Sequence, residues 1–236
     1  MLRLVSWNCQ SGFHKKLPVL ESLKPDVAVI QEVTEKALEM LELGRRARWE
    51  GAKGKKGLAV ILFNDFKFLK PKKHKVVNQY FLPTKISNGK VDMELIGVWT
   101  KGLKDSHENG YVGQAHNFMT DNPRAFSAKT MFVGDFNANT IWDKGRREKT
   151  FSALVSKLEP YGVKSAYHHV TGDTHGKERH PTLYMYRHFH DEKKAYHIDY
   201  CFAGSHWLKK LEKVQIHKGE KWKSVSDHFP LVCDFR

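Results

Sequence analysis

Five short polar blocks stand in order along the chain, and four of them lie at or just past the end of an apolar, strand-like run. The blocks are Ser6-Trp7-Asn8, Gln31-Glu32, Gly134-Asp135-Phe136-Asn137, His197-Ile198-Asp199-Tyr200 and Ser226-Asp227-His228. Each block centres on a carboxylate, a carboxamide or an imidazole. Such side chains, gathered at one rim of a sheet, bind a hard divalent cation and activate water against a phosphate ester.

The apolar runs between the blocks predict an α/β (α+β) fold. Strand patterns rich in Val, Ile, Leu and aromatic residues cover 1–8, 26–31, 58–63, 75–82, 92–100, 130–134, 196–202 and 229–235. Helical spacing of apolar residues covers 15–23, 34–43 and 147–159, with a less regular candidate over 110–126. Strands outnumber helices, and the helices are spread along the chain, which suggests two packed sheets with helices outside. The chain has no repeat and no break in composition, so we expect residues 1–236 to form a single domain.

The charge balance favours a polyanionic partner. Forty Lys and Arg residues against 26 Asp and Glu give a net charge of +14, and nucleic acid is the commonest polyanion. Charge alone does not choose among DNA, RNA and anionic lipid, and it also fits an ordinary solvated surface. The Lys-rich segments 53–56 and 70–75 flank strands and are expected to be hairpin or edge loops.

The cysteines and the apolar runs favour a cytoplasmic location. Cys9, Cys201 and Cys233 are odd in number and lack CxxC spacing, so we expect core thiols in a reducing compartment. Met1 leads straight into a strand pattern, so no signal peptide is expected. No apolar run approaches the roughly 20 residues needed to cross a bilayer.

Two of the blocks suggest how their side chains cooperate. Gly134 permits a sharp exit from a strand, and residues two apart on an extended chain, such as Asp135 and Asn137, point to the same side. The pair can address one ligand, although a turn built on Asx residues is a common alternative. Asp199 lies among apolar residues and needs a charged or hydrogen-bonded partner, and the His228 imidazole suits it.

From Trp7-Asn8 to Asp227-His228, the ordered blocks resemble the endonuclease/exonuclease/phosphatase superfamily. Its members include exonuclease III-type AP endonucleases, deoxyribonuclease I, neutral sphingomyelinases and inositol polyphosphate 5-phosphatases. The resemblance implies a four-layer α/β sandwich, with two mixed β-sheets face to face and helices on the outer faces. It also implies hydrolysis of phosphate esters that depends on Mg²⁺ and is supported by Mn²⁺.

The resemblance also implies roles for individual residues. Glu32 matches the principal metal ligand, with Asn8 and Asp227 near the metal or the phosphate. Asp135 matches the residue that positions or deprotonates the attacking water. Asn137 matches the residue that holds a phosphate oxygen.

Two further residues match the family's phosphate contacts. His228, oriented by Asp199, is implied to bind the phosphate and stabilise its charge, and Tyr111 resembles a tyrosine that precedes a helix and contacts the phosphate. The chain departs from many relatives at Gln10, where they carry Asp or Asn. Trp99 stands where deoxyribonuclease I and the sphingomyelinases carry a histidine, which makes the chain more similar to the exonuclease III branch.

Two segments outside the blocks are candidates for contact with substrate or metal. A basic loop that contains one aromatic residue follows the Asp135 block and can clamp a phosphate backbone and stack on a base, the alternative being a solvated helix start with a core Trp. Its candidate residues are Trp142, Lys144, Arg146 and Arg147. Segment 168–197 holds seven of the 14 histidines. A zinc site is conceivable there, but without CxxC or HExxH we favour polar loop histidines. They are His168, His169, His175, His180, His188, His190 and His197.

The sequence therefore predicts a cytoplasmic, monomeric, metal-dependent phosphodiesterase that acts on nucleic acid, DNA rather than RNA, without a membrane partner. One alternative is a phosphatase or lipid phosphodiesterase of the same superfamily, for which Phe81-Leu82-Pro83 is the nearest candidate for a membrane-facing hairpin. A second alternative is a catalytically silent nucleic-acid-binding protein.

Overall fold

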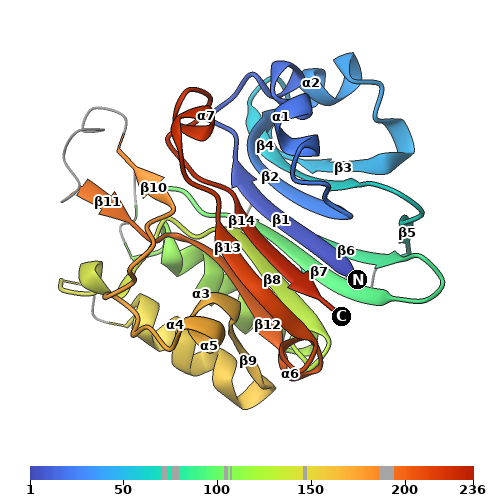
Figure 1. Cartoon of the computed structure of the whole chain (residues 1–236). Helices are drawn as coiled ribbons and strands as arrows, with labels where there is room; N and C mark the ends of the chain where they lie inside the picture. The colour runs from blue at the N-terminus through green and yellow to red at the C-terminus, as the bar shows by residue number, and fades with distance from the viewer. Residues whose placement is uncertain (71–73, 76–79, 104–105, 107, 146–147, 186–193) are drawn as a thin grey trace.

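Two six-stranded mixed sheets pack face to face, and helices cover their outer faces (Figure 1). This computed structural model describes residues 1–70, 74–75, 80–103, 106, 108–145, 148–185 and 194–236. The arrangement is the expected α/β sandwich of four layers.

The first sheet joins the two ends of the chain. Its strands are β1 (Leu2–Asn8), β2 (Val27–Thr34), β3 (Ala47–Glu50), β4 (Lys56–Leu62), β13 (Leu211–Ile216) and β14 (Leu231–Phe235), in the order β13-β14-β1-β2-β4-β3. β1 runs parallel to β2 and antiparallel to β14, and Leu2 pairs with Phe235. The two termini therefore lie close together (Figure 1).

The second sheet carries the middle of the chain. Its strands are β5 (Lys67–Leu69), β6 (Phe81–Ser87), β7 (Asp92–Trp99), β8 (Thr130–Asp135), β9 (Val163–Ser165) and β12 (Asp199–Gly204), in the order β5-β6-β7-β8-β12-β9. β8 is parallel to β7 and antiparallel to β12. A separate two-stranded ribbon pairs β10 (Leu183–Tyr184) with β11 (Ala195–Tyr196).

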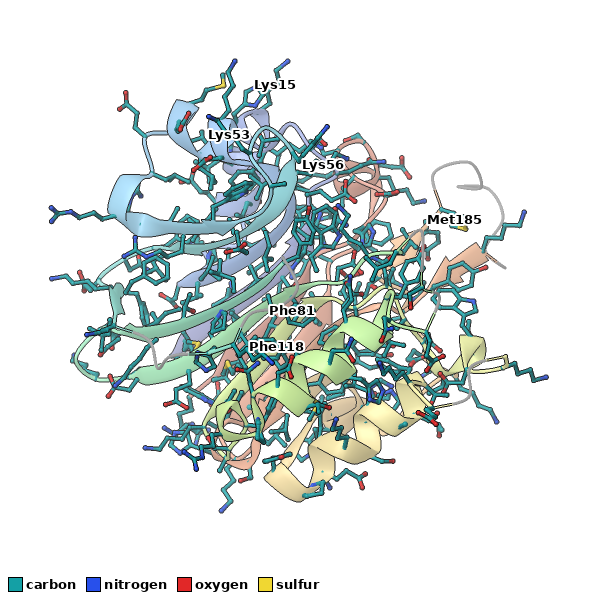
Figure 2. The ribbon with its side chains drawn as sticks, turned by 180° about the vertical axis from the view of Figure 1, so that it is seen from behind. Lys15, Lys53, Lys56, Phe81, Phe118 and Met185 are labelled. Carbon is teal, nitrogen blue, oxygen red and sulfur yellow. The ribbon has the colours of Figure 1, made fainter. Side chains whose placement is uncertain are left out.

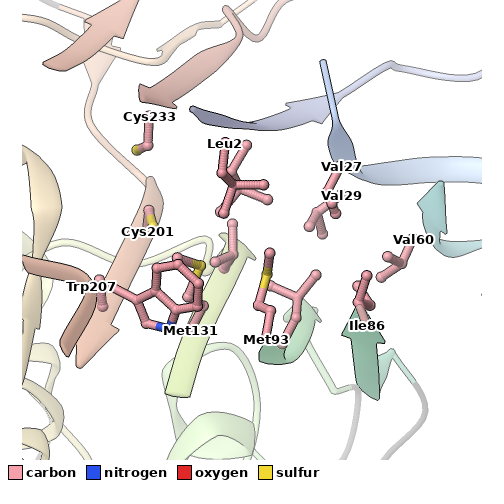
Figure 3. Close-up of a cluster of buried hydrophobic side chains, with 14 of the residues drawn as sticks. Leu2, Val27, Val29, Val60, Ile86, Met93, Met131, Cys201, Trp207 and Cys233 are labelled. Carbon is pink, nitrogen blue, oxygen red and sulfur yellow. The ribbon is translucent and has the colours of Figure 1, made fainter. Parts of the chain in front are cut away.

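The core between the sheets consists of apolar side chains at alternate strand positions. Val27 and Val29 of β2 face Met93 of β7 and Met131 of β8 across this interface (Figure 3). Alternation directs every second side chain of a strand into the same layer. Cys201 and Cys233 belong to this core and Cys9 to the outer one on the first sheet, so the expectation of core thiols is confirmed.

Most of the helices bury the outer face of one of the sheets. They are α1 (Leu17–Glu21), α2 (Glu35–Met40), α3 (Val112–Asp121), α4 (Phe151–Leu158), α5 (Ala166–Thr171), α6 (Ser205–Leu208) and α7 (Glu220–Lys223). α1 and α2 lie on the first sheet, and α3 and α4 on the second (Figure 1). The Thr34 hydroxyl accepts a hydrogen bond from the Ala37 amide at 3.2 Å and so caps the N-terminus of α2. Among the described residues, no helix is long and apolar enough to cross a bilayer.

The candidate membrane hairpin Phe81-Leu82-Pro83 is wrong, because its aromatic residue belongs to the core. Phe81 begins β6, is 1% exposed and stacks on Phe118 of α3 with ring centres 4.8 Å apart (Figure 2). Burial of this ring leaves no apolar tip to enter a lipid surface. Residues 81–83 therefore give no support to a lipid substrate.

The predicted strand over 75–82 overlaps β6 (Phe81–Ser87) only at residues 81–82. Residues 76–79 lie outside the described residues, and neither 75 nor 80 is in a strand. β6 contains Pro83 and three polar residues, so its sequence does not show the apolar pattern of a strand. It nevertheless pairs with β7 over its whole length. Pro83 lacks a backbone N–H and normally argues against an inner strand. The other predicted strands overlap observed ones, although 196–202 divides between β11 and β12.

Candidate active site

Strand ends from both sheets meet at one end of the sandwich and carry four of the polar blocks. Asn8 ends β1 and pairs in register with Gln31 of the parallel strand β2. Asp199 begins β12 and lies directly opposite Asp135, the last residue of β8. β1 faces β8 across the sandwich: the Asn8 carboxamide donates to the Asp135 carboxylate at 3.0 Å. Topology thus joins side chains that are far apart in sequence.

The backbone at this rim adopts conformations that L-residues avoid. Glu32 has φ +62° within a β-bulge where the pairing of β2 with β4 shifts between Gln31 and Val33. Asn137 and Tyr111 also have positive φ, at 45° and 48°. Each such residue costs of order 1–3 kcal/mol and persists where the surroundings enforce it, typically at functional sites. The bulge turns Glu32 out of the strand alternation and toward the rim.

Asp135 is fully buried and held by three hydrogen bonds. Oδ1 accepts from the Asn137 amide N–H at 2.8 Å, and Oδ2 accepts from the carboxamides of Asn8 and Asn137 at 3.0 Å each. Burial raises the pKa of Asp135 to about 7, and the negative charge of Asp199 contributes to the rise. The carboxylate can therefore take or release a proton near neutral pH.

His228 lies between two carboxylates. Its Nδ1 contacts Oδ2 of Asp199 at 2.9 Å, and its Nε2 lies 4.0 Å from Oδ2 of Asp135. Burial by itself lowers the pKa of the imidazole, but Asp199 and then Asp135 raise it to about 10. Thr182 fixes this arrangement, because its hydroxyl accepts the backbone N–H groups of Ile198 and Asp199 at 3.0 and 3.1 Å. The structure therefore brings Asp199 and His228 together as expected.

The residues expected at the metal offer hard oxygen atoms at the open side of the rim. The Glu32 carboxylate accepts from Asn8 at 3.2 Å and pairs with the Lys56 ammonium at 2.6 Å. Burial raises the pKa of Asp227, and the negative charge of Glu32 adds to this effect. A divalent cation would relieve this repulsion between carboxylates, so the donor set fits Mg²⁺. Burial lowers the pKa of Lys16, although the carboxylates of Asp227 and Glu32 oppose this shift.

Two details of this metal candidate differ from simple sequence expectations. The Asn8 side chain turns its nitrogen toward Glu32 and Asp135, and its oxygen accepts the Gln10 amide N–H at 3.1 Å. Direct ligation by Asn8 thus stays a prediction that requires its oxygen to turn. Lys56 belongs to a segment expected to be a loop, but it begins β4, and its register opposite Thr34 brings it to Glu32. The only sequence feature that pointed to Lys56 was its place at the end of the Lys-rich segment 53–56.

A cavity of about 470 Å³ opens beside Asn137 and has mostly apolar walls. Its walls include Tyr111, Trp142, Leu183, Tyr196 and Ile198. The Trp142 ring lies 4.8 Å from that of Tyr196 and is 41% exposed, so Trp142 is not the core residue of the alternative interpretation. Tyr111 is likewise 41% exposed. The cavity can receive a flat or apolar group attached to a phosphate held at the rim.

Of the four candidates for substrate contact, two lie at or near the cavity and two lie outside the described residues. Trp142 ends a 3₁₀ turn (Thr140–Trp142) in the cavity wall, and Lys144 is exposed two residues beyond it. Arg146 and Arg147 lie outside the described residues. Lys149, farther along the same loop, donates to Asn117 at 2.8 Å and thus belongs to the packing of this loop on α3.

The sequence profile described as "Endonuclease/Exonuclease/phosphatase family" matches residues 5–228. The chain belongs to this family. No curated protein sequence matches the chain.

Solved structures show how fully the chain shares the fold of endonuclease/exonuclease/phosphatase proteins. An AP endonuclease from Archaeoglobus fulgidus has a TM-score of 0.74 at 18% identity, covering 100% of this chain and 99% of that chain. A variant of the 3′ phosphatase NExo from Neisseria, bound to a product DNA hairpin, has a TM-score of 0.69 at 19% identity and covers 100% of both chains. D. rerio TDP2, complexed with a single-strand DNA product, has a TM-score of 0.67 at 16% identity, covering 100% of this chain and 98% of that chain.

Three histidines of the histidine-rich segment, His168, His175 and His197, lie close together, whereas His169 and His180 are exposed. His168, His175 and Glu178 bring their ligand atoms within 4.8 Å of one another. Burial lowers the pKa of His175 and of His197 to about 4, so both imidazoles are neutral at pH 7. His180 contacts the Tyr167 hydroxyl at 2.9 Å. His188 and His190 lie outside the described residues.

Asn139 is a positioning residue that the sequence did not single out. Its carboxamide donates to the carboxylate of Glu178 at 3.2 Å and to the backbone carbonyl of His197 at 2.9 Å. Its side-chain oxygen accepts from the Ile141 amide and caps the turn that carries Trp142. Asn139 thus ties the cavity wall to the histidine-rich segment. The sequence feature that could have drawn attention to Asn139 is its position two residues after Asn137.

Proposed function

We propose that the chain is a divalent-metal-dependent phosphodiesterase that hydrolyses nucleic acid, DNA rather than RNA. The observation that carries this proposal is the network of Asp135, Asn137, Asp199 and His228 beside two half-buried carboxylates at the rim. Membership of a family of phosphoester hydrolases supports the reaction class. Two proteins of the same fold were solved with product DNA, which supports the substrate class.

Glu32 and Asp227, with Asn8 turned to present its oxygen, are proposed to hold Mg²⁺, which Mn²⁺ can replace. The bound ion supplies charge stabilisation at the phosphate and the leaving oxygen. Lys56 shares the Glu32 carboxylate at 2.6 Å, and its partly exposed ammonium can move to solvent or to a phosphate.

The remaining roles belong to the buried network. Asp135 orients the attacking water and accepts its proton, for which its pKa near 7 is suited. His228 carries a positive charge below about pH 10 and donates from Nε2 to a phosphate oxygen, while Asp199 holds its Nδ1–H. The Asn137 carboxamide, released from its hydrogen bond to the Thr100 carbonyl, and the Tyr111 hydroxyl complete the contacts to the phosphate.

Charge and the cavity support a nucleic-acid substrate over a small phosphate ester. The net charge of +14 attracts a polyanion over many contacts. Trp142 can stack on a base at the cavity, and Lys144, together with Arg146 and Arg147, can neutralise neighbouring phosphates. The buried, unpaired thiols support action in the cytoplasm, and we propose that the protein works there as a monomer.

Cleavage of supercoiled plasmid in Mg²⁺ tests the proposal. We expect nicking that EDTA abolishes and that Asp135→Asn lowers about 10²–10⁴-fold, because the variant keeps the shape of the side chain but cannot accept a proton. Asp65→Asn is the matched control, since Asp65 is an exposed carboxylate outside the site. It should leave the rate unchanged.

Three results would contradict the proposal in different ways. Nicking that survives EDTA or Asp135→Asn would place the reaction elsewhere. Hydrolysis of phosphoinositides or sphingomyelin, without action on plasmid, linear DNA, abasic DNA or RNA, would establish the lipid alternative. Binding of metal and DNA with no hydrolysis would establish the catalytically silent alternative.

A further inference from the structure

A second cluster of metal-binding side chains lies beneath the cavity wall, away from the rim. His168 comes from α5, and His175 and Glu178 come from the segment that follows it. One Glu178 oxygen lies 3.2 Å from Nε2 of His168 and 3.9 Å from Nδ1 of His175. Ligands bound at about 2.0–2.2 Å in tetrahedral geometry stand roughly 3.4 Å apart, which is close to these separations. The rings of His168 and His175 stack with centres 3.5 Å apart, so one ring must turn for both nitrogens to meet the same ion.

Two imidazole nitrogens at this cluster are buried without a hydrogen-bond partner. His175 Nδ1 is buried and has no hydrogen-bond partner. His197 is 2% exposed, its ring centre lies 5.9 Å from that of His168, and its Nε2 is also buried without a partner. A buried polar atom left without a partner costs about 1–3 kcal/mol, which a bound cation would remove.

The surroundings fix these side chains as second-sphere partners fix the ligands of a metal. His197 Nδ1 contacts the backbone carbonyl of His180 at 2.7 Å and must donate to it, which leaves the lone pair on Nε2. His168 Nδ1 contacts the Ser165 hydroxyl at 2.8 Å, which leaves its Nε2 toward Glu178. Backbone and side-chain N–H groups from Gly176 and Asn139 hold the Glu178 carboxylate.

We propose that His168, His175 and Glu178 bind a Zn²⁺ ion, and that His197, which lies outside their 4.8 Å group, turns toward the ion as the fourth ligand. A set of imidazoles with one carboxylate suits Zn²⁺, whereas Mg²⁺ takes oxygen ligands alone. Four protein ligands leave no open coordination position, which is typical of a structural rather than a catalytic zinc ion. It would be distinct from the cation site at Glu32 and Asp227.

The zinc ion is placed to stiffen the wall of the cavity. Asn139 joins Glu178 to the turn that carries Trp142. Gly176 packs so closely on this turn that a Cβ atom there would clash with the Thr140 hydroxyl. A clamp at Glu178 thus restrains both the segment that contains Gly176 and the turn that lies on it.

Metal analysis of the full-length protein tests this inference independently of any activity. We expect about one zinc per chain after dialysis against buffer that contains Mg²⁺, and an X-ray absorption spectrum with nitrogen and oxygen ligands but no sulfur. His175→Ala and the conservative Glu178→Gln should each weaken Zn²⁺ binding at least about 100-fold in competition with a chromogenic chelator, since even second-sphere changes cost 10–100-fold. His169→Ala is the matched control, because His169 is exposed beside His168 on α5.

Thermal unfolding provides a second readout. Added Zn²⁺ should raise the Tm of the metal-stripped protein and of His169→Ala, but not that of His175→Ala or Glu178→Gln. Less than about one-tenth of a zinc per chain, or equal affinities of Glu178→Gln and His169→Ala, would overturn the proposal. Sulfur ligands in the absorption spectrum would also overturn it, because the proposed site contains none.

Discussion

At the scale of single residues, Asp135 and His228 set the pH dependence of the proposed reaction. Asp135 acts as a carboxylate, so activity should rise with pH through its pKa of about 7, and His228 acts as a cation, so activity should fall as pH passes about 10. His228→Gln removes the positive charge that lowers the pKa of Asp135, so the rising limb should move to higher pH while kcat falls about 10²–10³-fold. Profiles of kcat/KM with a soluble phosphodiester measure both effects. His206→Gln, at the far end of β12, should leave the profile unchanged, and a rising limb that stays in place in His228→Gln would contradict the assignment.

At the scale of elements, Gly134 lets β8 deliver Asp135 to the rim. It has φ +149°, and a Cβ atom there would clash with the Val98 carbonyl oxygen of β7. Gly134→Ala should therefore lower the free energy of unfolding by about 2–4 kcal/mol, measured by urea denaturation, since it combines backbone strain with overpacking. Gly89→Ala is the matched control: Gly89 also has a positive φ but open space around its Cβ, so only strain remains. Equal losses in the two variants would show that close contact with β7 does not matter.

The elements also show why sequence reasoning reached part of this site and not all of it. The Asp199–His228 contact was predictable because a carboxylate in an apolar strand needs a partner. The Lys56–Glu32 contact was not, because it depends on a bulge and on the register of β2 against β4. The edge strand β13 (Leu211–Ile216) was missed because its half-exposed, charged pattern resembles a loop. The roles of the metal and phosphate residues, and a single domain over residues 1–236, stay predictions.

At the scale of the whole molecule, the net charge of +14 predicts how binding responds to salt. Figure 2 shows Lys15, Lys53 and Lys56 on the side of α1 and α2. If such groups neutralise DNA phosphates, the logarithm of the association constant should fall linearly with the logarithm of salt concentration, with a slope of about −3 or steeper. Fluorescence anisotropy with duplex DNA measures this slope, with EDTA present to prevent cleavage.

A matched pair of charge reversals separates local contact from the overall field. Lys144→Glu lies beside the cavity and Lys209→Glu lies just after α6 at the opposite end of β12, yet both change the net charge equally. Loss of a phosphate contact should make the slope shallower by about 1 in Lys144→Glu alone. Hydrolysis of a small phosphodiester should hardly respond to either reversal, since a single charge carries no condensed counterions. Equal slopes in the two variants would mean that nucleic acid senses only the total charge, and Lys144 would then have no part in the interface.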